Sequence, residues 1–160
     1  MPIVDERRSR CVACYFSLAT EPSTAPLLDE LWAAGIVVLT PRVRGTELEW
    51  IRSLPESPYT SGAFGIREVQ GGHAEALVEA DLVFMPALAV STSGVRLGQG
   101  GGFYDRALSR LEQIPLLIAL LYAEEDSIDV PGQAHDVPVD VVATERGIRW
   151  ITKGAWSPST

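Results

Sequence analysis

Lysine is almost absent from this sequence of 160 residues, which holds one, at position 153. A P-loop needs a lysine directly after its last glycine, so that nucleotide motif is excluded. Two histidines, His73 and His135, are too few and too far apart for a histidine-rich metal site. No apolar run approaches the roughly 18 residues of a membrane span. The first residues also lack an apolar signal core, and we therefore expect a cytoplasmic protein without membrane contact.

Cysteine is scarce too, and Cys11 and Cys14 are spaced like a redox pair. Both fall in an expected strand, where residues three apart face opposite sides, whereas an active pair prefers a helix N-terminus. We therefore interpret them as buried thiols. Basic residues are outnumbered as well, 13 against 21 acidic ones, and the net charge is −8. Such a charge excludes broad nucleic-acid binding, which needs a basic surface.

Glycine, in contrast, is concentrated within the stretch 96–106, at Gly98 and at positions 100–102. We call residues 98–102 the glycine loop. It follows an apolar run at 82–85 and precedes an expected helix at 104–111. Backbone N–H groups in such a loop, together with a helix N-terminus, favour an anion such as phosphate. Arg96 and Arg106 bracket the loop with positive charge.

The glycine loop does not match the dinucleotide fingerprint Gly-x-Gly-x-x-Gly. Phe103 or Asp105 occupies the last glycine position, depending on where the count starts. Glycine content alone is equally typical of a mobile surface loop. The arginine, tyrosine and aspartate around it favour a ligand site.

Apolar runs and amphipathic stretches predict alternating strands and helices. The expected strands are 12–18, 36–39, 48–51, 82–85, 116–121, 139–143 and 148–151, and the expected helices are 25–34, 73–80 and 104–111. Thr24 is the expected N-cap of the first helix and Gly35 its stop. This order predicts an α/β fold, a single three-layer domain over 1–160 with a mostly parallel sheet and loose ends at 1–10 and 156–160. Ligands of such folds lie beyond the carboxyl ends of the strands, where the glycine loop falls.

Several segments in this order resemble the 5-formyltetrahydrofolate cyclo-ligase family, also called methenyltetrahydrofolate synthetase. The segments are 82–89, 96–105, 15–18 with Glu21 and Thr24, 64–66 with Glu68, and 135–140. The resemblance covers roughly residues 11–149. It implies ATP-dependent closure of 5-formyltetrahydrofolate to 5,10-methenyltetrahydrofolate, with release of ADP and phosphate. Such a reaction requires positioning and charge stabilisation rather than a nucleophilic side chain.

The resemblance implies that ATP and Mg²⁺ bind around the glycine loop. Arg96 would offset phosphate charge and Tyr104 would bond a phosphate or the formyl group, which makes these two the expected catalytic residues. The expected ATP-binding residues are Arg96, Gly98, Gln99, Gly100, Gly101, Gly102, Tyr104 and Asp105. Asp105 and Asp140 are the candidates for the metal, with Asp136 in reserve. A helix cap at Asp105 and a turn at Asp140 are equally consistent with the sequence.

The reduced folate is the expected second partner. Glu21 matches a family carboxylate that meets the pterin, where it accepts hydrogen bonds from the amino-pyrimidine edge. Phe64 and Phe103 are expected to pack on the pterin or the aminobenzoyl ring, and Tyr104 also belongs to this set. Phe103 replaces a tyrosine that is common in the family.

The family usually begins with a helical, basic segment that helps to bind ATP, and this chain is expected to be shorter there. Arg7, Arg8 and Arg10 are the basic residues before the first expected strand. Two hypotheses follow. The chain is an active cyclo-ligase, or it is a weak or inactive paralogue that binds folate or a phosphate ligand as a sensor or partner subunit.

Overall fold

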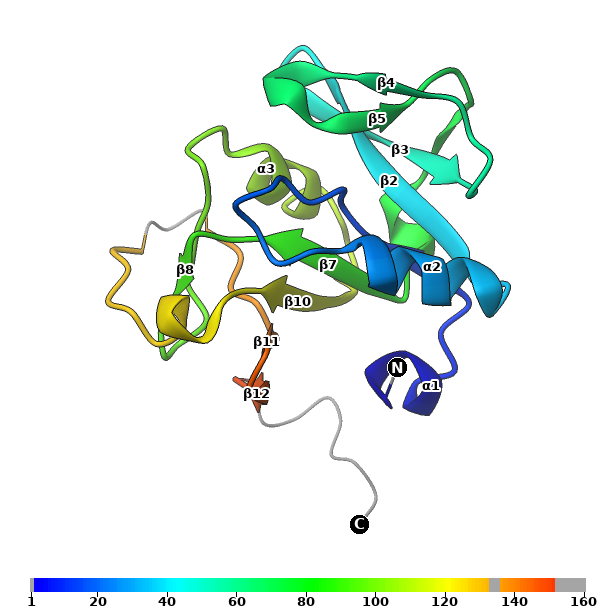
Figure 1. The fold of residues 1–160 in the computed structure, drawn as a ribbon. Coiled ribbons are helices and arrows are strands. Elements are labelled where there is room, and N and C mark those ends of the chain that lie inside the picture. Colours follow the sequence, from blue (N-terminus) through cyan, green and yellow to red (C-terminus); the bar gives the residue numbers. More distant parts are fainter. Residues whose placement is uncertain (1, 133–135, 152–160) are drawn as a thin grey trace.

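The structure is a computed structural model, and it describes residues 2–132 and 136–151 (Figure 1). The helices are α1 (Pro2–Glu6), α2 (Ala25–Ala33) and α3 (Phe103–Leu108), with 3₁₀ turns at Ala63–Gly65, Leu77–Glu79 and Ala123–Glu125. The strands are β1 (Cys11–Ala13), β2 (Val37–Arg44), β3 (Glu47–Ser53), β4 (Tyr59–Ser61), β5 (Arg67–Val69), β6 (Ala74–Glu75), β7 (Leu82–Pro86), β8 (Ala89–Val90), β9 (Arg96–Leu97), β10 (Leu116–Leu120), β11 (Val141–Thr144) and β12 (Gly147–Trp150). None of the helices in the described ranges is long and apolar enough to cross a membrane.

In this part of the chain the main sheet has eight strands, in the order β12-β11-β10-β7-β1-β2-β3-β6. Its five central strands, from β11 to β2, are parallel to one another. The outer strands β12, β3 and β6 are antiparallel to their neighbours. The expected mostly parallel sheet is thus confirmed. The carboxyl ends of the central strands meet along one edge of the sheet.

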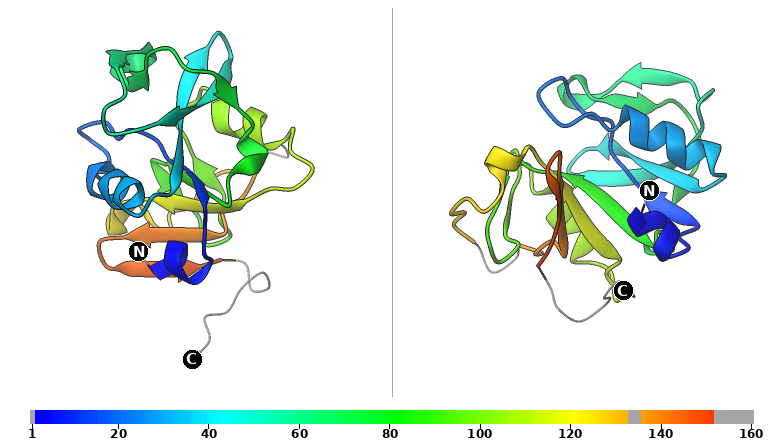
Figure 2. Two further views of the ribbon diagram at one scale, coloured as in Figure 1. Left: turned by 90° about the vertical axis from the view of Figure 1, so that its right-hand side faces the viewer. Right: turned by 60° about the horizontal axis from the view of Figure 1, so that its bottom comes forward.

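The side chains of the central strands alternate between two apolar cores. Leu82 and Phe84 of β7 face the core under α1 and α2, whereas Val83 and Met85 face the core under α3. Figure 2 shows α2 and α3 on opposite sides of the sheet. Both faces are therefore covered, which explains why the strands read as continuous apolar runs in the sequence.

The expected helix at 73–80 is wrong. Ala74 and Glu75 form β6, the edge strand that pairs with β3, and a 3₁₀ turn follows at Leu77–Glu79. Leu77 and Ala80 are both buried. Residues three apart lie on one side of a 3₁₀ turn as they do on a helix, so their spacing does not distinguish the two.

The second expected strand, 36–39, does not end before Pro41. It runs on to Arg44 and pairs with β3 throughout. Pairing with β1 covers only Val37 to Leu39, so from Thr40 onward β2 has a neighbouring strand on one side only. Proline is tolerated in that setting because its missing N–H faces no ladder.

The first expected strand is shorter than 12–18 and ends at Ala13. Thr24 holds the chain that follows: its Oγ1 donates to the Tyr15 carbonyl at 2.8 Å and accepts from the Ser17 N–H at 3.0 Å. Thr24 does precede the helix as expected, but its side chain makes no cap hydrogen bond. Gly35, with φ +72°, follows the helix end.

The expected loose start of the chain is also wrong, because Ile3 and Val4 of α1 are 7% and 3% exposed and belong to the core beside α2. The expected loose tail at 156–160 and the motif residue His135 lie outside the described residues.

Candidate active site

A cavity of about 450 Å³ lies at the carboxyl ends of β1 and β7. We call it the loop cavity. Tyr15, just beyond β1, and Pro86, at the end of β7, line it together with the glycine loop. The β4–β5 hairpin contributes Phe64 and Glu68. The site thus lies where an open α/β sheet places its ligands, as the sequence predicts.

The glycine loop presses closely on its own flanking side chains. Gly100 and Gly102 have φ of +88° and +62°, a region that other residues rarely adopt. A Cβ on Gly98 would lie 2.7 Å from Arg96 Nη1. Within the described part of the chain, the backbone N–H groups of the loop donate no hydrogen bond. The loop therefore presents free donors beside a guanidinium, which suits an anion.

Arg96 is buried beneath the loop and paired with Asp105. Its side chain is 6% exposed, and Nη2 donates to Asp105 Oδ2 at 3.1 Å. Nη1 donates to the Pro86 carbonyl, also at 3.1 Å. Arg96 Nε is buried without a partner among the described residues. The guanidinium is thus held rigidly with a donor left over.

Tyr104 lies between Arg96 and the aromatic core. Its ring packs edge-on against Trp50, with centroids 6.0 Å apart, and Arg96 Cζ lies 5.6 Å from the ring centroid. Burial raises the pKa of Tyr104 well above its ordinary value, and the positive charge of Arg96 opposes part of that rise. At neutral pH the phenol is therefore a proton-bearing donor.

Glu21 also lines the loop cavity. Its Oε2 accepts from the Leu18 N–H at 2.8 Å, which fixes the carboxylate. Gln99 of the glycine loop reaches across to Glu21 Oε1 at 3.5 Å, the outer limit of a hydrogen bond. A weak contact therefore joins Glu21 to the glycine loop.

Two phenylalanines meet at the border of the loop cavity. Phe64 is 71% exposed and has φ +59°, unusual for a bulky residue. Its ring packs edge-on against Phe103, with centroids 6.4 Å apart. They come from the 3₁₀ turn before β5 and from the first position of α3, so two separate segments present aromatic faces to one cavity.

The two aspartates expected to share a metal are not brought together. Asp105 lines the loop cavity, but Oδ2 is paired with Arg96 and Oδ1 accepts from the Val137 N–H at 3.2 Å. Asp140 is not among the lining residues and accepts from the Leu117 N–H at 3.0 Å, near the start of β10. Asp136, the reserve candidate, does line the cavity. Within the described ranges, no group of three or more His, Cys, Asp or Glu residues is arranged to hold a metal ion.

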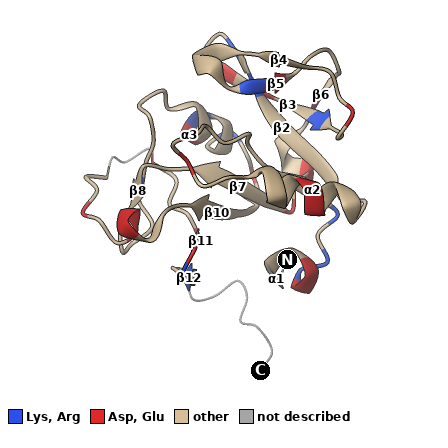
Figure 3. Cartoon of the chain, in the orientation of Figure 1, with Lys and Arg blue, Asp and Glu red and all other residues tan. Residues whose placement is uncertain are grey.

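Two arginines outside the lining of the loop cavity have structural partners. Arg106, expected to flank the anion site, donates to the Thr46 carbonyl at 2.7 Å and so ties α3 to the β2–β3 turn. Arg42 pairs with Glu49 at 2.8 Å. Figure 3 shows the basic residues spread over separate elements, among them α3, β5 and β12. Helix α3 has six residues, too few for an appreciable dipole, so the anion preference rests on the loop N–H groups and Arg96.

Two polar residues that line this cavity, Glu68 and Tyr15, were not predicted as site residues from the sequence. Glu68 is 6% exposed and accepts from the Val43 N–H at 3.0 Å, which holds β5 against β2. A Cβ on Gly62 would clash with the Glu68 carboxyl group, so any larger residue there would displace that carboxylate. Tyr15 is the second, and its position just after a parallel strand was the available signal.

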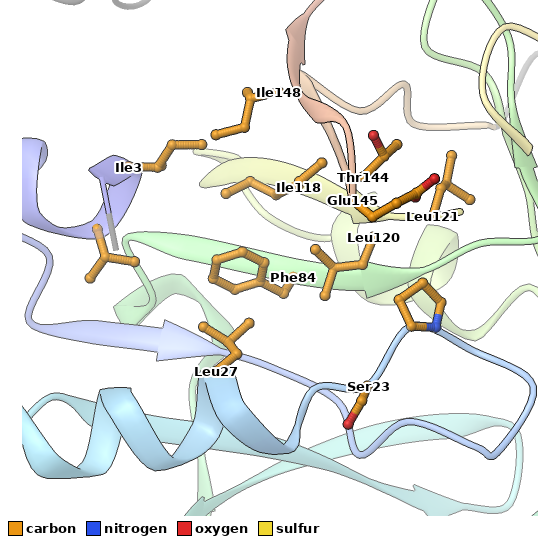
Figure 4. Close-up of a pocket in the computed structure, with 13 residues that line it drawn as sticks. Ile3, Ser23, Leu27, Phe84, Ile118, Leu120, Leu121, Thr144, Glu145 and Ile148 are labelled. Carbon is orange, nitrogen blue, oxygen red and sulfur yellow. The ribbon is translucent and has the colours of Figure 1, made fainter. Parts of the chain in front are cut away.

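A second hollow, of about 280 Å³, lies on the opposite face of the sheet. We call it the apolar groove. Figure 4 shows Leu27 of α2, Phe84 of β7 and Ile118 of β10 directed toward a common space, with Ile148 of β12 across from them. Ser23, Thr144 and Glu145 supply its polar edge. No residue that the sequence marked as a candidate lines it.

Comparison with known proteins agrees with the geometry of the loop cavity. The model of the 5-formyltetrahydrofolate cyclo-ligase family matches residues 3–145. A 5-formyltetrahydrofolate cyclo-ligase of Mycolicibacterium smegmatis is 37% identical over 87% of this chain and 76% of its own length. The one from Haemophilus influenzae is 32% identical over 86% and 76%. A solved structure of Aquifex aeolicus 5,10-methenyltetrahydrofolate synthetase superposes with a TM-score of 0.79 at 31% identity, covering 96% of this chain and 77% of that one. This chain therefore belongs to the 5-formyltetrahydrofolate cyclo-ligase family.

Proposed function

We propose that this protein converts 5-formyltetrahydrofolate to 5,10-methenyltetrahydrofolate and consumes ATP, with release of ADP and phosphate. One observation carries the proposal beyond family membership. A single cavity is lined both by a glycine loop with a buried arginine and by a fixed carboxylate, Glu21. The first suits a polyphosphate and the second the amino-pyrimidine edge of a pterin, so the cavity suits both reactants at once.

On the phosphate side, the chain supplies donors that are in place before the ligand arrives. ATP contributes the phosphoryl group that activates the formyl oxygen. The N–H groups of the glycine loop orient the phosphates, and Arg96 stabilises the negative charge that develops on transfer. Because Asp105 and Pro86 hold Arg96 in place, the guanidinium loses little freedom on binding. Tyr104, which keeps its proton, donates to an oxygen of the phosphate or of the formyl group.

On the folate side, Glu21 accepts from the pterin and so fixes its orientation. Phe64 and Phe103 pack against the flat parts of the folate. Gln99 must release Glu21 before the carboxylate can take both bonds from an amino-pyrimidine edge. Binding of the folate therefore requires the Gln99 side chain to turn away from Glu21.

The residues present do not by themselves form a magnesium site. Both oxygens of Asp105 already accept hydrogen bonds, and Asp140 lies outside the cavity lining. A hard ion that keeps several waters and phosphate oxygens needs one or two protein carboxylates, and Asp105 and Asp136 both line the cavity.

A cytoplasmic location also remains a prediction.

The test is the absorbance of methenyltetrahydrofolate after purified protein is mixed with 5-formyltetrahydrofolate and Mg-ATP. We expect product to form and to depend on ATP. The matched control omits ATP and should give no absorbance. Saturable folate binding without turnover would contradict the proposal and favour a binding paralogue.

A further inference from the structure

Tyr15 carries an unexplained polar atom into the loop cavity. The residue is 3% exposed, lines the cavity and lies just beyond β1. Its hydroxyl oxygen is buried and has no hydrogen-bond partner among the described residues. Buried hydroxyls nearly always have a partner, and leaving one unpaired costs stability. An unpaired hydroxyl at the border of a ligand cavity therefore indicates a partner that arrives with the ligand.

The backbone prevents Tyr15 from seeking a partner elsewhere. Its carbonyl accepts from Thr24 Oγ1 at 2.8 Å, and the preceding N–H, that of Cys14, donates to the Leu39 carbonyl at 2.9 Å. The alternation of β1 places Ala13 in the core under α3 and Cys14 in the other core. Tyr15 is thus held on the face that carries Tyr104 and the glycine loop.

The two tyrosines of the cavity experience different charges. Burial raises the pKa of Tyr15 far above its usual value, and the nearby carboxylates of Glu21 and Glu125 raise it further. Burial and Glu21 raise the pKa of Tyr104 as well, but there the positive charge of Arg96 acts in the opposite direction. A phosphate would be repelled at Tyr15 and attracted near Tyr104. The hydroxyl of Tyr15 therefore suits an uncharged acceptor.

We infer that Tyr15 binds the reduced folate, its hydroxyl donating a hydrogen bond to a neutral oxygen of the folate's bicyclic head, either the ring carbonyl or the formyl oxygen. This assignment rests on the proposed function. It makes Tyr15 a residue that distinguishes folates by that oxygen, beside Glu21, which reads the amino-pyrimidine edge. Tyr104 remains the donor on the phosphate side.

Ligand access to the hydroxyl requires movement, because the oxygen is buried in this structure. The weakest restraint at this part of the cavity is the 3.5 Å contact between Gln99 and Glu21. Breaking that contact frees the Glu21 carboxylate for the folate.

The test is Tyr15→Phe, which removes a single buried oxygen. We expect the dissociation constant for 5-formyltetrahydrofolate, measured by calorimetry without ATP, to rise about threefold to tenfold, the usual effect of losing one neutral hydrogen bond. The KM for ATP should stay unchanged. Thermal stability should be equal or higher, since an unpaired buried hydroxyl is removed.

Tyr59→Phe is the matched control. The Tyr59 hydroxyl donates to the Leu54 carbonyl at 2.7 Å, and Tyr59 does not line the loop cavity. This variant should lose stability and keep its folate affinity, the reverse of Tyr15→Phe. Unchanged folate binding in Tyr15→Phe, a change in ATP affinity instead, or a loss of stability would each overturn the inference. Wild-type protein that binds folate without turnover would contradict the proposed reaction while leaving this binding test intact.

Discussion

The loop cavity and the apolar groove lie on opposite faces of one sheet and differ in what lines them. The cavity holds a buried arginine, a fixed carboxylate, two protonated phenols and the free N–H groups of the glycine loop. The groove is lined mainly by aliphatic and aromatic carbon, and Glu145 is its one charged residue among those described. By shape alone, both hollows are candidate ligand sites. Polar groups that are in place and left unpaired favour the loop cavity as the proposed site, because leaving them so costs stability.

The largest expected effect comes from removing the positive charge of Arg96 from the loop cavity. Arg96→Ala should lower kcat at least about a hundredfold, because a preorganised donor to developing charge is lost. The rate at which the absorbance of methenyltetrahydrofolate increases at saturating substrate measures kcat.

Arg110→Ala is the control for Arg96→Ala. Arg110 forms an exposed pair with Glu47 at 2.8 Å, and exposed pairs contribute little. Its activity should equal that of wild type. Arg96→Lys keeps the charge and controls for loss of activity through unfolding. Its circular dichroism should show a folded protein, and its kcat should still be lowered, since lysine lacks the forked donors. Activity of a folded Arg96→Ala within tenfold of wild type would remove the main argument for the site.

Two carboxylates give a sharper test, one in each hollow. Glu21→Gln keeps the shape and the acceptor for Leu18 but removes the charge, so the KM for 5-formyltetrahydrofolate should rise about tenfold to a hundredfold, as expected for a charge-assisted bond. Glu145→Gln makes the same change in the apolar groove, where Glu145 accepts from the Ala123 N–H at 2.9 Å. It should leave both KM values unchanged. Equal effects of the two substitutions would contradict the distinction between the hollows.

Alkaline pH should lower the stability of the protein, in part through the two buried phenols of the loop cavity. Burial raises the pKa of Tyr15 and Tyr104, and burial with nearby carboxylates raises that of the Cys11 thiol to about 11. Below about pH 8 folded and unfolded chains both keep these protons and the stability is complete, because the ordinary pKa is about 8.5 for a thiol and about 10 for a phenol. As the pH rises further the unfolded chain releases protons first, so the free energy of unfolding falls with pH.

Urea unfolding at pH 8, 9 and 10 measures that decline. The double variant Tyr15→Phe, Tyr104→Phe should show a shallower decline, with the part due to the thiols remaining. Stability that is constant or rises over this range would contradict the raised pKa values.

The central strands and the glycine loop were predictable because their signals are local. The run Leu82–Pro86 is apolar on both faces, so a buried strand follows directly. The helix expected at 73–80 failed because good helix formers there pair instead with the edge of β3, a partner distant in sequence. Pairing along an edge is a tertiary effect that composition does not contain.

The site was predicted in part, for a comparable reason. Glu21, Phe64 and Asp105 are far apart in sequence, yet they line one cavity with the glycine loop. Asp140 does not, because it precedes a parallel strand and so lies at the amino edge of the sheet. Tyr15 follows a strand and lies at the carboxyl edge. Whether a residue precedes or follows its strand therefore distinguishes these two positions, and the order of residues along the chain contains that signal.

The smallest expected effect compares two exposed aliphatic residues, Leu97 at the loop cavity and Ile148 at the apolar groove. They are 44% and 47% exposed, so they differ in place more than in burial. Leu97→Ser should raise the KM for folate or ATP about twofold to fivefold, because apolar contact with a bound ligand is lost. Ile148→Ser should leave both KM values unchanged and lower the free energy of unfolding by about 1 kcal/mol or less. If Ile148→Ser changed KM and Leu97→Ser did not, the apolar groove rather than the loop cavity would hold the substrate.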